Sequence, residues 1–210
     1  MKKNAVNHPW EAIYAREGRV FDEPFPGYSA VALKFSRNSC RRILDLGCGN
    51  GRHVVALVKD DFEVVGLDIS SSGLRLTREW LREEELEADL VAADFRQGLP
   101  FAGECFDGLL STQVIHHAMI AEVRLAIAEI WRVLKKGGIA FVTVAGSTHA
   151  TLAYEEIEPG TFIPLSGTEK GLPHHIFSET DLRWELGPFQ VEQIERRAEG
   201  RVLACWLRKR

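Results

Sequence analysis

The sequence lacks the features that mark several classes of protein. Four cysteines occur among 210 residues and none forms a C-x-x-C pair, so neither a zinc knuckle nor a redox motif is indicated. No apolar run approaches the roughly 18 residues of a membrane span, and we expect a cytoplasmic protein without a membrane partner. The net charge of −4 gives no general attraction to phosphate backbones, which argues against nucleic acid as a partner.

The middle of the chain alternates strand-like and helix-like runs, and no internal repeat interrupts them. Such alternation predicts an α/β fold with a parallel sheet, and the length suits one domain over 1–210. The expected strands are 42–46, 63–68, 88–93, 106–111 and 139–144, followed by a closing hairpin of 189–196 and 201–207. The expected helices are 53–59, 71–85 and 122–134, with a short one from 178 to 186.

The most informative segment is a glycine-rich turn after the first expected strand. Gly47, Gly49 and Gly51 follow the apolar run 42–46 at every second position, and a helical pattern comes next. Glycine permits positive φ and exposes bare backbone, so a ligand can approach atoms that a Cβ would block. In doubly wound nucleotide folds an acid that binds ribose is expected about 20 residues further on, and Asp68 stands there. The segment therefore predicts a nucleotide-cofactor site.

Three motifs together carry a family resemblance. They are Asp45-x-Gly-x-Gly-x-Gly, Asp68-Ile69-Ser70 and Ala93-Asp94-Phe95. Over about residues 8–145 the chain resembles the class I S-adenosylmethionine-dependent methyltransferases, in particular their small-molecule, type 11-like branch. The resemblance implies a doubly wound, mostly parallel seven-stranded sheet whose last strand is antiparallel. It also implies S-adenosylmethionine as cofactor and S-adenosylhomocysteine as product.

The resemblance assigns roles that agree with the chemistry of the side chains. Asp68 offers acceptor oxygens for two ribose hydroxyls, Asp94 can accept from the adenine amine, and Phe95 or Ile69 can cover the ring. A carboxylate at Asp45 suits a cationic ligand better than a pyrophosphate. The expected cofactor-binding residues are Trp10, Tyr14, Asp45, Gly47, Gly49, Asn50, Gly51, Asp68, Ile69, Asp94, Phe95, Thr112, Gln113 and His117.

Other readings of the glycine turn predict different functions. A nicotinamide dinucleotide fingerprint, G-x-G-x-x-G, would place its last glycine where Arg52 stands, which disfavours an oxidoreductase. An RNA- or protein-modifying methyltransferase and a non-catalytic module that binds S-adenosylmethionine stay open as alternatives. The preferred hypothesis is methyl transfer to a small-molecule acceptor by in-line displacement, in which alignment of the reactants supplies most of the catalysis.

Two histidine pairs, at 116–117 and 174–175, suggest a metal ligand or a general base. Adjacent residues of a helix do not face each other, so we expect no metal site at the first pair. His117 and His175 are candidates for a general base that deprotonates an acceptor hydroxyl or amine. Packing or hydrogen bonding is the alternative role for both.

Two segments are expected to cover the site. Residues 8–34 begin with Trp10, Ile13 and Tyr14 at helical spacing and are predicted to form an N-terminal lid. Residues 146–177 contain three prolines and four glycines and are too long for a simple connection. We expect this segment to be a substrate-capping insertion that determines acceptor specificity, because loops on a rigid scaffold commonly carry such contacts.

Overall fold

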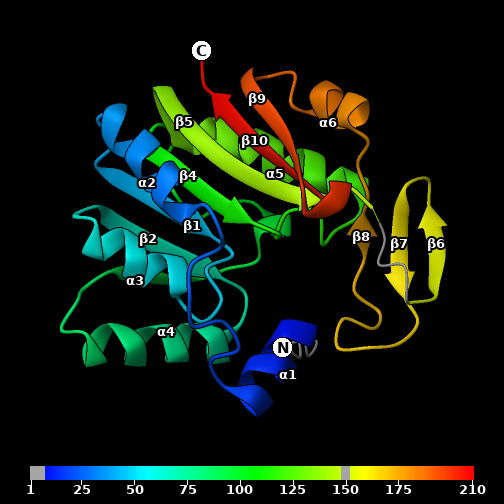
Figure 1. The fold of residues 1–210 in the computed structure, drawn as a ribbon, viewed down its shortest axis with the longest axis horizontal. Helices are drawn as coiled ribbons and strands as arrows, with labels where there is room; N and C mark the ends of the chain where they lie inside the picture. Colours follow the sequence, from blue (N-terminus) through cyan, green and yellow to red (C-terminus); the bar gives the residue numbers. More distant parts are fainter. Residues whose placement is uncertain (1–7, 148–151) are drawn as a thin grey trace.

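A central twisted sheet organises the molecule (Figure 1). The computed structural model describes residues 8–147 and 152–210. Within this part of the chain, seven strands lie in the order β3-β2-β1-β4-β5-β10-β9. Their bounds are Arg42–Leu46 (β1), Glu63–Asp68 (β2), Asp89–Ala92 (β3), Phe106–Thr112 (β4), Leu134–Ala145 (β5), Gln190–Arg197 (β9) and Val202–Arg208 (β10).

The pairing of the strands confirms the predicted topology. Strands β1 to β5 are parallel, and β10 is antiparallel to both of its neighbours, β5 and β9. The chain order reverses between β1 and β4, which creates the switch point where ligands of doubly wound sheets bind. The molecule therefore has the Rossmann-like methyltransferase fold that the sequence predicts.

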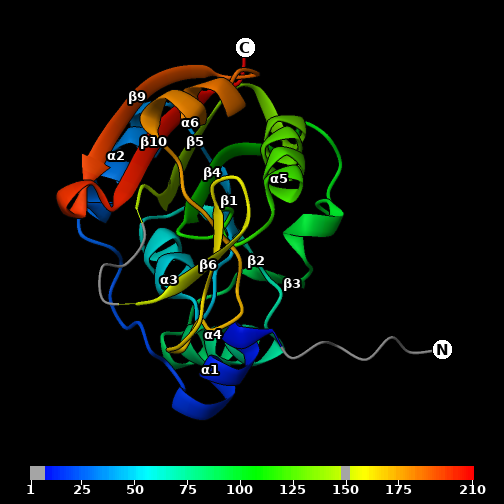
Figure 2. The same cartoon turned by 90° about the vertical axis from the view of Figure 1, so that its right-hand side faces the viewer.

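Helices cover both faces of this sheet, as Figures 1 and 2 show. One face packs against α2 (Tyr28–Arg37), α3 (Arg52–Lys59) and α4 (Ser71–Glu83), and the other against α5 (Ile120–Val133) and α6 (Glu179–Glu185). Side chains alternate between the faces along each strand, so in β1 Ile43 enters one core and Leu44 the other. Both are fully buried, as expected for a parallel strand covered on two sides.

The observed β5 begins five residues before the predicted 139–144 strand. Leu134 already pairs with Phe106, and the amide of Gly137 donates to the carbonyl of Lys209. Residues 134–138, which directly follow α5, therefore belong to the sheet.

The N-terminal helix α1 (Pro9–Glu17) lies outside the sheet, across the carboxyl ends of its strands (Figure 1). Its Glu11 carboxylate accepts hydrogen bonds from the Ser70 hydroxyl at 2.7 Å and from the amide and hydroxyl of Ser72 at 3.0 and 2.7 Å. By contrast, α2 places Phe35 in the core with no exposed surface. Within the predicted 8–34 lid, α1 and Phe21 thus lie at the strand ends, whereas α2 packs on one face of the sheet.

The predicted capping insertion contains a second small sheet. Strands β6 (Tyr154–Glu158), β7 (Thr161–Pro164) and β8 (His174–His175) pair in antiparallel fashion. This sheet is attached to the main domain where the amide of His175 donates to the carbonyl of His116 at 2.8 Å. Residues 148–151 of the insertion lie outside the described part of the chain. Among the described residues, no helix is long and apolar enough to cross a membrane.

Short 3-10 turns complete the fold at two points near the strand ends. One spans Phe95–Gln97 after β3, and the other spans Ala198–Gly200 between β9 and β10. Asp94 precedes the first turn, and its side chain accepts from the Arg96 amide at 3.0 Å. This cap fixes the direction in which the chain leaves β3 beside the carboxyl end of β2.

Candidate active site

A cavity of about 530 Å³ lies at the carboxyl ends of β1 to β4. Helix α1 and the segment that carries β8 contribute to its wall. Most of the predicted cofactor-binding residues line it: Trp10, Tyr14, Gly47, Gly49, Asn50, Asp68, Ile69, Asp94, Phe95, Thr112, Gln113 and His117. The fold thus gathers into one cavity side chains that lie up to a hundred positions apart in the sequence.

The glycine turn is tightly covered by neighbouring side chains. Gly47 has φ +77°, and a Cβ at this position would lie 2.5 Å from Val114 Cγ1. Gly49 has φ +55°, and its Cβ would overlap the Tyr14 hydroxyl. The amides of Gly47 and Cys48 donate to the carbonyl of Leu67 at 2.7 and 3.0 Å, which ties the turn to β2. Only glycine allows this close approach of backbone and side chains.

Two predicted cofactor contacts lie behind the cavity wall rather than on it. Gly51 starts α3 and packs against Thr77, whose Cγ2 would be 2.5 Å from an added Cβ. Asp45 is 1% exposed, and its Oδ2 has no hydrogen-bond partner. Burial raises the pKa of Asp45 to about 7, although the nearby Arg52 opposes the rise. Asp45 is therefore buried behind the glycine turn and does not line the cavity.

Asp68 is held at the end of β2 with both oxygens oriented. Oδ2 accepts from the Gly49 amide and Oδ1 from the Ser70 amide, each at 2.8 Å. Burial raises the pKa of this carboxyl, and backbone hydrogen bonds from Ser70, Gly49 and Ile69 oppose the rise. Each carboxylate oxygen can accept two hydrogen bonds, so acceptor capacity remains for a ligand hydroxyl.

Asp94 is paired with a residue that the sequence reasoning missed. Arg96 Nε donates to Oδ1 at 2.9 Å and Arg96 Nη2 to Oδ2 at 2.8 Å. Burial would raise the pKa of Asp94, but the hydrogen bonds from Arg96 outweigh it and the pKa lies below its ordinary value. The sequence signal for this pair is that Arg96 follows Asp94 by two residues, so the two side chains can meet across a single turn.

Gln113, the residue directly after β4, has a strained backbone conformation. Its φ of +59° is uncommon outside glycine, and such residues are often found at functional sites. Its amide donates to the carbonyl oxygen of Thr143 at 3.1 Å and to the Thr143 hydroxyl oxygen at 2.9 Å. These bonds turn the chain abruptly after Thr112, so that both residues border the cavity.

The structure corrects the expectation for the two histidine pairs. Residues 114–118 form a turn and not a helix, and the ring centroids of His116 and His117 lie only 4.1 Å apart. In the second pair, His174 lines the cavity. His175 Nδ1 instead forms a hydrogen bond of 2.7 Å with the Thr161 hydroxyl, and its ring packs against Phe177. The candidate base His175 therefore does not line the cavity, whereas its neighbour His174 does.

Residues 44–142 match the model of a methyltransferase domain. These residues form a class I S-adenosylmethionine-dependent methyltransferase domain. A ubiquinone biosynthesis O-methyltransferase of Mesorhizobium japonicum is 33% identical over 107 residues, which are 51% of this chain and 42% of that protein. A tRNA (carboxymethyluridine(34)-5-O)-methyltransferase alkbh8 of Xenopus tropicalis is 35% identical over 145 residues, 69% of this chain and 21% of that protein.

The similarity to solved structures extends over nearly the whole methyltransferase chain. The crystal structure of the PH0226 protein from Pyrococcus horikoshii superposes with a TM-score of 0.74 at 21% identity and covers 95% of this chain and 99% of that one. At this identity the likeness concerns the fold. The chain spans less than half the length of the two curated relatives.

The cavity fits the cofactor of this family. The glycine turn leaves bare backbone at the end of β1, Asp68 keeps free acceptor positions, and Phe95 supplies an apolar surface beside Asp94. The same cavity is lined by His117, from the turn after β4, and by Glu169 and His174, from the segment that contains β8. It therefore combines residues suited to a nucleoside with side chains suited to a polar reactant.

Proposed function

We propose that this protein transfers a methyl group from S-adenosylmethionine to a small-molecule acceptor. The observation that carries the proposal is the single cavity that joins the predicted cofactor residues to a second group of polar side chains. Its volume of about 530 Å³ falls within the roughly 300–1,000 Å³ of small-molecule sites. When bound, the cofactor supplies a methyl group on a positively charged sulfur, which is already activated for displacement.

The residues of the chain would contribute mainly by holding the reactants in line. Asp68 is fixed by two backbone amides before any ligand arrives, so little side-chain entropy is lost on binding. Gln113 is fixed in the same way by Thr143. Alignment of this kind can lower a barrier by roughly 7–11 kcal/mol, so methyl transfer to an acceptor of adequate nucleophilicity requires no catalytic triad.

The position of α1 supports a small acceptor. Trp10 stacks on Tyr14 with ring centroids 5.7 Å apart and approaches His117 at 6.2 Å, so aromatic rings stand over the cavity. Three hydrogen bonds from Ser70 and Ser72 to Glu11 hold the helix in this place. A long polymer would have to displace α1 to reach the site, whereas a small molecule can be enclosed beneath it.

Methylation of RNA is the second candidate, and the tRNA methyltransferase among the relatives is the observation that favours it. Arg52, Arg96 and Arg201 line the cavity, but Arg96 is already paired with Asp94 and Arg52 lies over the Phe21 ring at 4.7 Å. Together with the net charge of −4, these pairings favour the small-molecule acceptor.

The experiment is to supply S-adenosylmethionine with a labelled methyl group to a cell extract separated into small molecules, RNA and protein. We expect protein-dependent label in the small-molecule fraction, and little of it with the Asp68→Ala variant. Asp89→Ala, which removes an exposed carboxylate at the start of β3, serves as the matched control and should label normally. Label in the RNA fraction alone would overturn the small-molecule assignment.

A further inference from the structure

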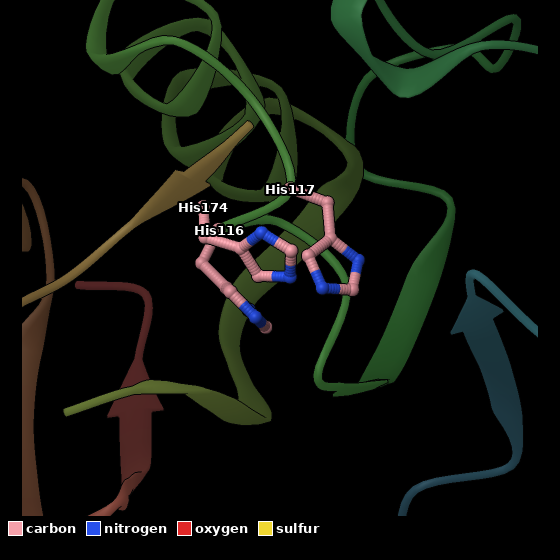
Figure 3. A group of neighbouring side chains, drawn as sticks. All are labelled: His116, His117 and His174. Atoms are coloured by element: carbon pink, nitrogen blue, oxygen red, sulfur yellow. The ribbon is translucent and has the colours of Figure 1, made fainter. Parts of the chain in front are cut away.

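Three histidines that line the cavity converge at one place in its wall (Figure 3). His116 and His117 come from the turn after β4, and His174 comes from β8. One ring nitrogen from each lies within 4.8 Å of the other two. The hydrogen bond from the His175 amide to the His116 carbonyl sets this approach, because it joins β8 to the turn.

The three imidazoles are buried, and one of them has an unpaired nitrogen. His116, His117 and His174 are 2, 8 and 7% exposed, and among the described residues His116 Nδ1 has no hydrogen-bond partner. A neutral imidazole offers a lone pair, which is the form that binds metal ions. A buried polar nitrogen without a hydrogen-bond partner is energetically unfavourable unless a bound ligand supplies that partner.

The contacts of His174 fix the orientation of its ring. Its Nδ1 lies 2.9 Å from the Leu172 carbonyl oxygen, which can only accept, so Nδ1 donates there. Its Nε2 lies 3.1 Å from Glu169 Oε2.

The three histidine nitrogens lie within 4.8 Å of one another and would have to move closer together to share one ion. Bonds of 2.0–2.1 Å in a tetrahedral zinc site place neighbouring ligand atoms about 3.3 Å apart. His174 Nε2 and Glu169 Oε2 are already at 3.1 Å, and Glu169 Oε1 lies 3.9 Å from His117 Nε2. The hydrogen bond from His174 Nδ1 to a backbone carbonyl is the arrangement that commonly orients a metal-binding histidine.

We propose that His116, His117 and His174 bind one divalent transition-metal ion, for which Zn²⁺ best matches the donor set. Three imidazoles leave one position of a tetrahedral shell, and Glu169, whose Oε2 lies 3.1 Å from His174 Nε2, is the candidate for it. The ion joins the turn after β4 to the segment that contains β8, and so holds the small sheet against the main domain. Mg²⁺, which prefers oxygen ligands, should not replace it.

The test is metal binding by the full chain without a histidine tag. After removal of metals with a chelator, the protein is incubated with Zn²⁺, separated from free ion and analysed by elemental mass spectrometry. We expect about one zinc per chain, a higher thermal midpoint with Zn²⁺ than with Mg²⁺, and visible absorption of tetrahedral type with Co²⁺. The Co²⁺ spectrum of the unmutated chain gives this answer even where variants do not fold.

Substitutions then assign the ligands. His116→Gln and His174→Gln should each reduce bound zinc at least tenfold, whereas His175→Gln, a buried neighbour on the same strand, should retain it. Absence of stoichiometric zinc in the folded wild type, or equal retention in all three variants, would overturn the proposal. Titration with S-adenosylhomocysteine is run in parallel, because loss of that binding with zinc retained would count against the proposed function alone.

Discussion

Replacing Glu11 by alanine should detach α1 from the domain without unfolding the sheet. The carboxylate accepts three hydrogen bonds from Ser70 and Ser72 at the start of α4. Bonds to a charged group contribute about 1.5–3 kcal/mol when buried, and we take about 1 kcal/mol each here because Glu11 is half-buried. Their sum, about 3 kcal/mol, corresponds to roughly a hundredfold rise in the undocked population of α1.

Hydrogen exchange measured by mass spectrometry is the appropriate assay. A peptide covering α1 should lose protection by roughly this factor in Glu11→Ala, while a peptide covering α5 stays unchanged. Glu17→Ala is the matched control, since Glu17 is on the same helix and its salt bridge is to the adjacent Arg16. Equal exchange in α1 for the wild type and Glu11→Ala would refute the view that this carboxylate holds the helix.

The docking of α1 should also depend on pH in a defined direction. Burial raises the pKa of Glu11, but the hydrogen bonds from Ser70 and Ser72 outweigh burial and lower it below the ordinary 4.5. A lowered pKa in the folded state means that the stabilisation is complete above about pH 4.5 and is lost as the pH falls through the lowered value. Protection of α1 should therefore decrease in acid earlier than that of α5, and Glu11→Ala should remove this difference.

Two further substitutions test the cavity wall. Asp68→Ala should weaken binding of S-adenosylhomocysteine at least tenfold, measured by calorimetry. It should also lower the free energy of unfolding in urea by about 2–6 kcal/mol, because two buried amides lose their acceptor. The control Asp89→Ala should change neither quantity. Gly47→Ala should lower the free energy of unfolding more than Gly171→Ala. Alanine at positive φ costs about 1–2 kcal/mol at either position, but only at Gly47 would the added Cβ overlap a neighbour, Val114. Equal losses of stability would contradict the packing around Gly47.

The sheet and the cofactor end of the site could be predicted because their signals are local. Apolar strands covered on both faces, a turn that only glycine permits, and acids placed directly after strands all appear as short patterns, and the strand bounds differ from prediction mainly at β5. Such patterns do not distinguish residues on a cavity wall from those behind it. Asp45 and Gly51 belong to the same motif as Gly49, yet only Gly49 reaches the cavity.

The histidine cluster and the small sheet depend on contacts between distant segments, which a short pattern does not contain. Strand β8 has two residues and exists because it pairs with β7 and bonds to the turn at His116. The turn itself arises because Gln113 adopts positive φ, an uncommon conformation for a residue with a side chain. Glu169 approaches His174 only after both segments are in place, and so its role could not be predicted from spacing.

The most direct test of the account is calorimetric titration of the purified chain with S-adenosylhomocysteine and with NAD. The geometry of the glycine turn, Asp68 and Asp94 predicts one bound S-adenosylhomocysteine per chain and at least a hundredfold weaker binding of NAD. Binding of NAD as tight as that of S-adenosylhomocysteine would contradict the assignment of this cavity to a methyltransferase cofactor.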